Sequence, residues 1–357
     1  MGNDYQEVTM KAAVFEGPET ISIQNVTDPE CGADDIIVKV ADCGICGSDL
    51  HSYLEGAFVA PGQIMGHEFS GTVIEAGSRV EGVVVGDRVT AVPLTVCGRC
   101  PRCLEGATHL CEIGLAASVA YGLPGAFAEY VRVPNVVRGG NVHVLPSAVD
   151  DASAALVEPL AVALHAAKLA DPLPTDTCVV IGLGSIGINT VQMLKVMGAG
   201  RIIGIDVSPT RLEIARQFGA DITINGRERD PLEAVTEITG EGAYGVGARA
   251  DIVIEASGVP ALLGQAISMT RAAGKLRIAA LYEGEPPIPA NQIVQKEMSV
   301  SGTFAYKGEF GQVIDLLAAG RIQAAPVITH TFALDDIEQA FRTQLDKDIS
   351  IKVQVAP

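Results

Sequence analysis

The chain has 357 residues, of which 48% are apolar and 19% are charged. At roughly 150 residues per domain this length predicts two domains, and the balance of apolar to charged residues excludes a disordered chain. An excess of 43 acidic over 25 basic residues gives a net charge of −18. Because such a surface repels phosphate backbones, we expect no nucleic-acid partner.

No segment predicts a membrane partner or a targeting signal. The longest apolar stretches, such as Cys178–Ile188, are interrupted by glycine and fall well short of the roughly 20 residues that span a bilayer. Residues 1–7 contain neither the basic region nor the apolar region of a leader peptide. We therefore expect a cytoplasmic protein.

The first 156 residues contain short strand-like segments separated by Gly, Pro and Asp turns at irregular spacing. This pattern is typical of a β-rich, barrel-like domain. The expected strands are Lys11–Phe15, Ile36–Val40, Gly71–Glu75, Arg88–Ala91 and Ala128–Arg132.

From Cys178 onward, short apolar strands alternate with helical segments, the first of which runs to Met197. The alternation indicates a parallel sheet covered on both faces, a doubly wound α/β domain. Near the C-terminus, Phe310–Ala319 resembles a helix and Ile349–Val355 a strand. The expected strands of the sheet are Cys178–Ile181, Arg201–Ile205, Asp221–Ile224, Asp251–Glu255 and Lys275–Ala280.

A glycine-rich segment lies between the first of these strands and the following helix. It contains Gly182, Gly184 and Gly187, with Ser185 and Ile186 between the last two. Glycines at this spacing allow a tight turn and the approach of a pyrophosphate to the helix N-terminus, although they also serve close helix–sheet packing.

An acidic residue extends the glycine pattern. Asp206 ends the next strand, nineteen residues after Gly187. A carboxylate there accepts hydrogen bonds from ribose hydroxyls and repels a 2′-phosphate, so the pattern favours NAD over NADP. Arg211 follows on the next helix, where either a ribose contact or a solvated surface position fits it.

Four of the eight cysteines fall within fifteen residues: Cys97, Cys100, Cys103 and Cys111. Clustered cysteines in a reducing compartment indicate metal or redox chemistry, and four thiolates from one loop favour a structural zinc site. An iron–sulfur cluster is the alternative, but its usual run ends with a gap of three and a proline, whereas here the gap is seven. His109 lies inside the loop as a bystander.

A second metal site is predicted around Cys46, 21 residues before His67. Glu158 is a carboxylate in an otherwise apolar run and is a candidate third ligand, since a catalytic zinc takes three protein ligands and keeps one open position. The alternatives are a redox pair of Cys43 and Cys46, a core position for His67, and a helix N-terminal position for Glu158.

The order of these motifs resembles that of the zinc-dependent medium-chain alcohol and polyol dehydrogenases over essentially the whole chain. The segment from Gly44 to His51, the triplet Gly66-His67-Glu68, the cysteine loop and the glycine pattern all match, and Glu158-Pro159-Leu160 is closer to butanediol and sorbitol dehydrogenases. The resemblance implies a GroES-like catalytic domain over residues 1–156, with the zinc loop at 97–111. It also implies a Rossmann domain over 157–302 and a return to the catalytic domain over 303–357.

By this resemblance, Cys46, His67 and Glu158 bind a catalytic zinc, and Glu68 is a neighbouring or exchangeable ligand. Asp49 would accept the ring N–H of His67 and so fix its tautomer. The second zinc would occupy the four-cysteine loop, which makes two zinc ions per chain.

The same resemblance assigns a proton relay. Ser48 would take the alcohol proton and pass it through the cofactor ribose toward His51. Lys352 resembles the family's basic residue on the pyrophosphate, although a surface lysine on a strand also fits. Gly47 stands where some members carry an arginine that binds the pyrophosphate.

The sequence thus predicts an NAD-dependent dehydrogenase acting on a small secondary alcohol, diol or polyol and the corresponding ketone. An NADPH-dependent carbonyl reductase and a non-catalytic nucleotide-binding protein are the alternatives. The resemblance implies a homo-oligomer, a dimer or a tetramer. Four aromatic residues fit either a substrate pocket or core packing, and the substrate is not predicted: Tyr53, Phe58, Tyr121 and Phe304.

Overall fold

The computed structural model describes residues 9–242, 245, 247–282 and 284–357. The expectation of no leader peptide falls on residues 1–7, outside these ranges. The chain divides into two compact units. Unit 1 holds Met1–Glu158, Phe310–Ala319 and Gln323–Pro357, and unit 2 holds Pro159–Glu309 and Gly320–Ile322. Within the described ranges, no helix combines the length and the apolar character needed to cross a membrane.

Unit 1 is β-rich, as the turn pattern predicts. In its described part, β1 pairs with β2, and a larger sheet has the order β14-β15-β3-β4-β5-β7, with β6 also on β3. A core of aromatic and branched side chains, including Phe15, Phe69 and Phe127, fills the unit. Its strands are β1 (Thr9–Gly17), β2 (Thr20–Thr27), β3 (Ile36–Gly44), β4 (Glu68–Ala76), β5 (Arg88–Ala91), β6 (Tyr130–Val133), β7 (Val142–Val144), β14 (Ile328–Ala333) and β15 (Lys352–Ala356).

The helices of unit 1 are short, and α11 packs on β15 and β14 at the C-terminal end of the chain. Helix α4 (Val157–Ala170) begins in unit 1 and continues into unit 2. The helices and 3-10 turns of unit 1 are α1 (Gly47–Glu55), α2 (Pro101–Leu104), η1 (Thr108–Leu110), η2 (Leu115–Ala117), α3 (Asp151–Ala155), α10 (Phe310–Ala318), η4 (Ala325–Val327), η5 (Leu334–Asp336) and α11 (Ile337–Leu345).

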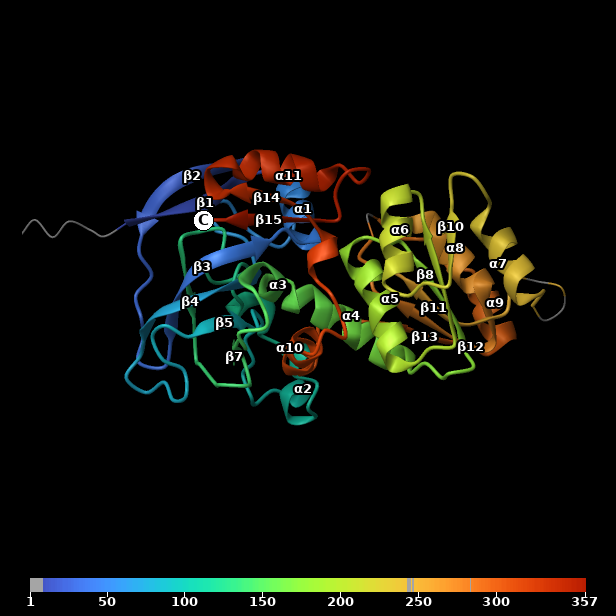
Figure 1. The fold of residues 1–357 in the computed structure, drawn as a ribbon, viewed down its shortest axis with the longest axis horizontal. Helices are drawn as coiled ribbons and strands as arrows, with labels where there is room; N and C mark the ends of the chain where they lie inside the picture. The colour runs from blue at the N-terminus through green and yellow to red at the C-terminus, as the bar shows by residue number, and fades with distance from the viewer. Residues whose placement is uncertain (1–8, 243–244, 246, 283) are drawn as a thin grey trace, which may run out of the picture. The chain divides into compact units, whose positions relative to one another are not determined.

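Unit 2 contains a parallel sheet with the order β10-β9-β8-β11-β12-β13 among its described strands. Numbered along the unit this order is 3-2-1-4-5-6, that of a dinucleotide-binding fold, which binds its ligand where the order reverses. The reversal falls between β8 and β11. Helices α5 and α6 lie on one side of the sheet, and α8 and α9 lie on the other (Figure 1).

The boundaries in unit 2 follow the predicted alternation closely. The strands are β8 (Thr177–Ile181), β9 (Arg201–Asp206), β10 (Ile222–Asn225), β11 (Ala250–Glu255), β12 (Thr270–Ile278) and β13 (Ser299–Gly302). The helices are α5 (Ser185–Met197), α6 (Pro209–Gln217), α7 (Pro231–Thr239), α8 (Pro260–Met269) and α9 (Ala290–Lys296).

Candidate active site and metal centres

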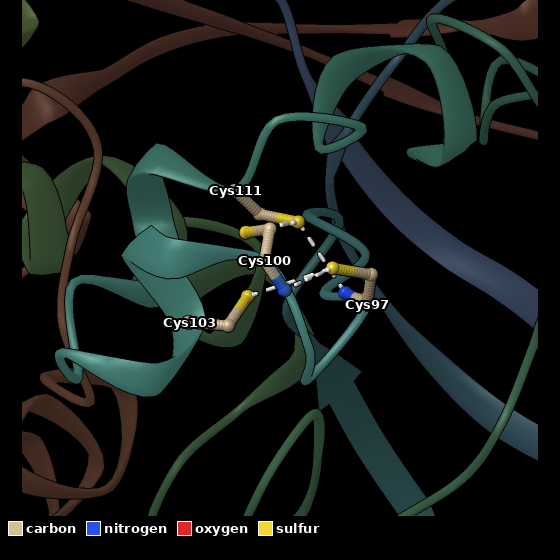
Figure 2. A group of neighbouring side chains, drawn as sticks. All are labelled: Cys97, Cys100, Cys103 and Cys111. Carbon is tan, nitrogen blue, oxygen red and sulfur yellow. Dashed lines mark hydrogen bonds between the residues drawn. The ribbon is translucent and has the colours of Figure 1, made fainter.

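The four cysteines of the 97–111 loop turn their sulfur atoms toward one another (Figure 2). The Sγ atoms of Cys97 and Cys103 lie 3.9 Å apart, and those of Cys100 and Cys111 lie 4.0 Å apart. Zn–S bonds of about 2.3 Å place the sulfurs of a tetrahedral site about 3.8 Å apart. The four thiols therefore fit a tetrahedral metal ion, and the eight cysteines, all within the described ranges, form no disulfide.

Backbone N–H groups favour the thiolate form in this loop. The amide of Cys100 donates to the Cys97 sulfur at 3.3 Å, and the amide of Cys97 donates to the Cys111 sulfur at 3.3 Å. Hydrogen bonds from the amides of Arg99 and Cys100 lower the pKa of Cys97 to about 6. Because thiolates are the form that binds metal, these donors prepare the loop for a cation.

A second cluster brings together Cys46, His67 and Glu68, whose ligand atoms lie within 4.8 Å of one another. Strand pairing creates it, because Gly44 at the end of β3 lies opposite Glu68 at the start of β4. Cys46 directly precedes α1, two residues after Gly44. A Cβ at Gly44 would lie 2.2 Å from a Glu68 carboxylate oxygen, so any side chain there would displace the Glu68 carboxylate.

Asp49 supports this cluster from the first turn of α1. One of its carboxylate oxygens accepts a hydrogen bond from the Cys46 amide at 2.9 Å. The other lies 3.7 Å from Nδ1 of His67, which is beyond hydrogen-bond distance. Asp49 and His67, which were predicted to be hydrogen-bonded, are therefore within ion-pair distance instead, and both are buried.

The surroundings of His67 favour positive charge. Burial lowers the pKa of His67, but the acidic groups of Tyr121, Asp49 and Cys46 outweigh it and raise that pKa well above 6.5. Among the described residues, its buried Nδ1 has no hydrogen-bond partner. A soft thiolate, an imidazole and a carboxylate are a donor set suited to zinc.

Glu68 is paired with Lys352. The Lys352 ammonium donates to both carboxylate oxygens at 2.8 and 2.6 Å and to the carbonyl of Ile45 at 2.7 Å. Lys352 is 2% exposed and Glu68 is 1% exposed. The expectation that Lys352 lies on the pyrophosphate is therefore corrected, because its ammonium is buried and its hydrogen bonds are directed to Glu68 and the α1 entry.

Glu158, the predicted third ligand, lies in the first turn of α4 and is 8% exposed. It does not belong to the group of ligand atoms within 4.8 Å, in which Glu68 supplies the carboxylate. It nevertheless raises the pKa of Lys352 by its negative charge, after the larger effects of burial, Glu68 and Cys46. The carboxylates of Glu68 and Glu158 therefore both raise the pKa of Lys352.

Ser48 and His51 lie on α1, immediately after Cys46. The Ser48 hydroxyl is 3.0 Å from the hydroxyl of Tyr121. The Tyr121 ring lies 5.4 Å from the His67 ring, and burial raises the pKa of its hydroxyl to about 12. Sequence reasoning did not separate Tyr121 from the other candidate aromatics, since its contacts with Ser48 and His67 depend on the fold.

The glycine-rich loop has the geometry that the pattern predicts. Gly182 has a φ of +83°, and a Cβ on Gly187 would lie 1.8 Å from the Gly182 carbonyl oxygen. By contrast, nothing lies within 4 Å of a Cβ built on Gly184, the residue before α5. The buried hydroxyl oxygen of Ser185 has no hydrogen-bond partner within the described ranges. This open helix N-terminus fits a phosphate group.

Asp206 ends β9 and folds back onto this loop. Its carboxylate accepts hydrogen bonds from the amides of Leu183 at 2.7 Å and Ser208 at 2.9 Å. The Arg211 guanidinium lies 3.9 Å from it. The carboxylate is thus fixed beside the turn, at the carboxyl end of the sheet.

Two family models match the chain: an alcohol dehydrogenase GroES-like domain over residues 32–143 and a zinc-binding dehydrogenase over residues 185–319. The sorbitol dehydrogenase of Bacillus subtilis (strain 168) is 36% identical over 98% of this chain and 97% of its own length. The chain belongs to the zinc-dependent medium-chain alcohol and polyol dehydrogenases.

Solved structures support the same assignment. The 2R,3R-butanediol dehydrogenase of Bacillus subtilis has a TM-score of 0.85 and 34% identity, covering 98% of this chain and 99% of that one. A structure from Sinorhizobium meliloti 1021, bound to NADP, has a TM-score of 0.89 and 33% identity over 98% and 100% of the two chains. The GroES-like and Rossmann-type fold is therefore confirmed, and the chain is an oxidoreductase of the alcohol dehydrogenase family.

Proposed function

We propose that this enzyme transfers hydride between NAD and a small secondary alcohol, vicinal diol or polyol, and reduces the corresponding ketone in reverse. The observation that carries the proposal is the meeting of the Cys46 thiol and the His67 imidazole, two of the three proposed metal ligands. The sorbitol dehydrogenase and butanediol dehydrogenase relatives favour diols and polyols as the substrate class.

The proposed catalytic zinc ligands are Cys46, His67 and Glu158. Glu68 lies nearer to the other two in this structure, but Lys352 already neutralises it. A metal ion that took Glu68 would leave a buried ammonium without its counter-ion, which is costly. We therefore propose that Glu68 stays with Lys352 during turnover and that Glu158 completes the set. A second zinc is proposed for the four-cysteine loop.

When bound, the metal polarises the alcohol oxygen and the nicotinamide accepts the hydride. The chain itself must hold the alcohol and move its proton. Ser48 accepts the alcohol proton at Oγ as its own hydroxyl proton leaves through the cofactor ribose toward His51, three residues later on the same helix. Asp49 holds the entry of α1 through the Cys46 amide, which keeps the thiol and the Ser48 hydroxyl in one place.

For the cofactor, we propose NAD. Gly184 and Ser185 would face the pyrophosphate at the start of α5, and Asp206 would accept from the ribose hydroxyls. A fixed carboxylate at that position disfavours a 2′-phosphate. The NADP-bound relative favours the alternative, an NADPH-dependent carbonyl reductase. Assembly into a homo-oligomer stays a prediction.

The test is a substrate screen of the purified, zinc-loaded protein. Short secondary alcohols, vicinal diols and linear polyols are assayed with NAD and with NADP, and ketones with NADH and NADPH. The proposal predicts turnover of alcohols with NAD at a higher kcat/KM than with NADP. A preference for NADPH and ketones would support the reductase, and nucleotide binding without any turnover would support the non-catalytic alternative. Activity that needs no metal but is lost on mild oxidation would favour a Cys43–Cys46 redox pair.

A further inference from the structure

A pair of hydroxyl groups lies beside the candidate metal ligands. The hydroxyls of Ser48 and Tyr121 are 3.0 Å apart and either one can be the donor. Both side chains are half-buried, and the Tyr121 ring packs 5.4 Å from the ring of His67. Seventy-three positions separate the two residues, so the pairing is a product of the fold.

The turn that carries Tyr121 is held firmly. The Ser118 carbonyl accepts hydrogen bonds from the amides of Tyr121, Gly122 and Leu123 at 3.2, 3.0 and 3.0 Å. The Leu123 carbonyl accepts a further hydrogen bond from the Gln63 amide group at 2.6 Å. Because the backbone on both sides of Tyr121 is fixed, its hydroxyl is positioned before any ligand arrives, which reduces the entropic cost of binding.

Two hydroxyls that share one hydrogen bond still offer one O–H donor and several acceptor lone pairs. An alcohol with one hydroxyl needs only Ser48, the proposed proton acceptor, and leaves Tyr121 bonded to it. A vicinal diol brings a second oxygen on the neighbouring carbon. We propose that Tyr121 is a specificity-determining residue that binds this second hydroxyl while Ser48 takes the proton of the first.

This inference rests on the proposed function and specifies its substrate class further. It also sets the size of the expected preference. Some sites leave a buried polar group without a hydrogen-bond partner when the substrate lacks a hydroxyl. Such sites prefer the hydroxyl-bearing substrate by about 10⁴-fold or more. When a mono-alcohol binds here, the Tyr121 hydroxyl keeps Ser48 as its hydrogen-bond partner. The expected preference for the diol is therefore about tenfold in kcat/KM, the value of one neutral hydrogen bond.

The experiment compares alcohols that differ by one hydroxyl: 2,3-butanediol with 2-butanol, and 1,2-propanediol with 2-propanol. Wild type, Tyr121→Phe and Tyr53→Phe are assayed with NAD. Tyr53→Phe is the matched control, because Tyr53 lies on the same helix as Ser48 but its ring packs against Phe341 in the core at 5.0 Å. Binding of each alcohol to the enzyme–NADH complex, which cannot oxidise it, is measured by calorimetry.

We expect Tyr121→Phe to lower kcat/KM for the diols about tenfold, mainly through KM, and to weaken diol binding to the NADH complex by a similar factor. For the mono-alcohols the loss should be severalfold smaller than for the diols, because they lose only the Tyr121 hydrogen bond to Ser48, and the control should match wild type. An equal loss on both alcohol classes would make Tyr121 a support for Ser48 only, and no loss on either would exclude it from the site; both overturn the inference alone. Absence of turnover and binding with every alcohol in wild type would instead overturn the proposed function, and this inference with it.

Discussion

Lys352 and Glu68 form a buried ion pair, with the ammonium 2.6 and 2.8 Å from the two carboxylate oxygens. Glu68 follows His67 directly in the sequence, so this pair borders the candidate catalytic metal. Its partners come from β4 and from β15, the last strand of the chain. Strand β15 thereby supplies the positive charge that neutralises Glu68.

Replacing one member of this pair should be strongly destabilising. Lys352→Met leaves the Glu68 carboxylate buried and uncompensated, at a cost of about 3–5 kcal/mol, and Glu68→Gln in the same chain should recover much of it. The measurement is thermal unfolding of the metal-loaded protein. Lys11→Met is the control, since its ion pair with Asp335 is solvent-exposed. A single variant as stable as wild type would contradict the pairing.

The glycine-rich loop allows a matched pair of substitutions. Gly184→Ala adds a methyl group into open space at the start of α5, so the fold should keep its melting temperature while NADH binding weakens about tenfold or more. Gly187→Ala places a Cβ 1.8 Å from a backbone oxygen and should lower both stability and binding. Calorimetric titration with NADH and thermal unfolding check this pattern. Unchanged NADH affinity in Gly184→Ala would count against a pyrophosphate at that position.

Asp206 is expected to set the cofactor preference. Asp206→Asn keeps one oxygen that can accept from the amides of Val207 and Ser208, gives up the oxygen that accepts from Leu183, and removes the charge that repels a 2′-phosphate. Since like-charge contacts in an interface cost several kcal/mol, the ratio of kcat/KM for NAD to that for NADP should fall about 10- to 100-fold. Steady-state kinetics with both cofactors measure the ratio. If it stays the same, another residue sets the preference.

Glu309 predicts a pH dependence of stability in the acid range. Burial raises the pKa of this carboxyl, but hydrogen bonds from His165 and the Lys307 amide, with the charge of Lys168, lower it to about 2. A carboxyl whose pKa is depressed on folding stabilises the protein above its unfolded pKa, and the contribution is lost as the pH falls toward the folded value. Glu309 should therefore contribute roughly 3 kcal/mol near neutral pH, disappearing between about pH 5 and pH 2.

Glu309→Gln tests this dependence. The difference in unfolding free energy between wild type and variant should be largest near pH 6 and shrink steadily as the pH falls to 2. Urea unfolding at several pH values gives the difference directly. Glu338→Gln, on an exposed pair with Arg342, serves as the control and should follow the wild-type curve. A difference that does not change with pH would refute the proposed depression.

The sequence was most informative where local pattern and fold coincide. The parallel strands of unit 2 are short apolar runs bounded by helices, and Arg201–Ile205 was expected where β9 spans Arg201–Asp206. Strand β2 (Thr20–Thr27) was not predicted, because its polar side chains are largely solvent-exposed and carry little apolar periodicity. Helix α1 was not predicted either, since two of its three buried residues, Asp49 and Ser52, are polar and only Tyr53 is apolar.

The sequence predicted which residues form the site better than it predicted which of them contact one another. Cys46 and His67 follow from motif spacing, and strand pairing brings them together. Lys352 lies 284 positions from its partner Glu68, and Tyr121 lies 73 positions from Ser48. A local sequence pattern therefore predicts neither contact. Lys352 was assigned to the pyrophosphate because it resembles the family's basic residue there, and a lysine in a strand gives no sign of burial. Only the tertiary fold shows that its ammonium is directed inward.

Cys46 and His67, with a carboxylate, are proposed to hold a catalytic metal that is separate from the metal of the four-cysteine loop. The most direct test is the zinc content per chain of wild type and of Cys46→Ser, with thermal unfolding to verify that the variant is folded. We expect two zinc ions in wild type and one in the variant, which should have no alcohol turnover. Two zinc ions in a folded Cys46→Ser variant, or one in wild type, would rule out a separate catalytic metal at Cys46.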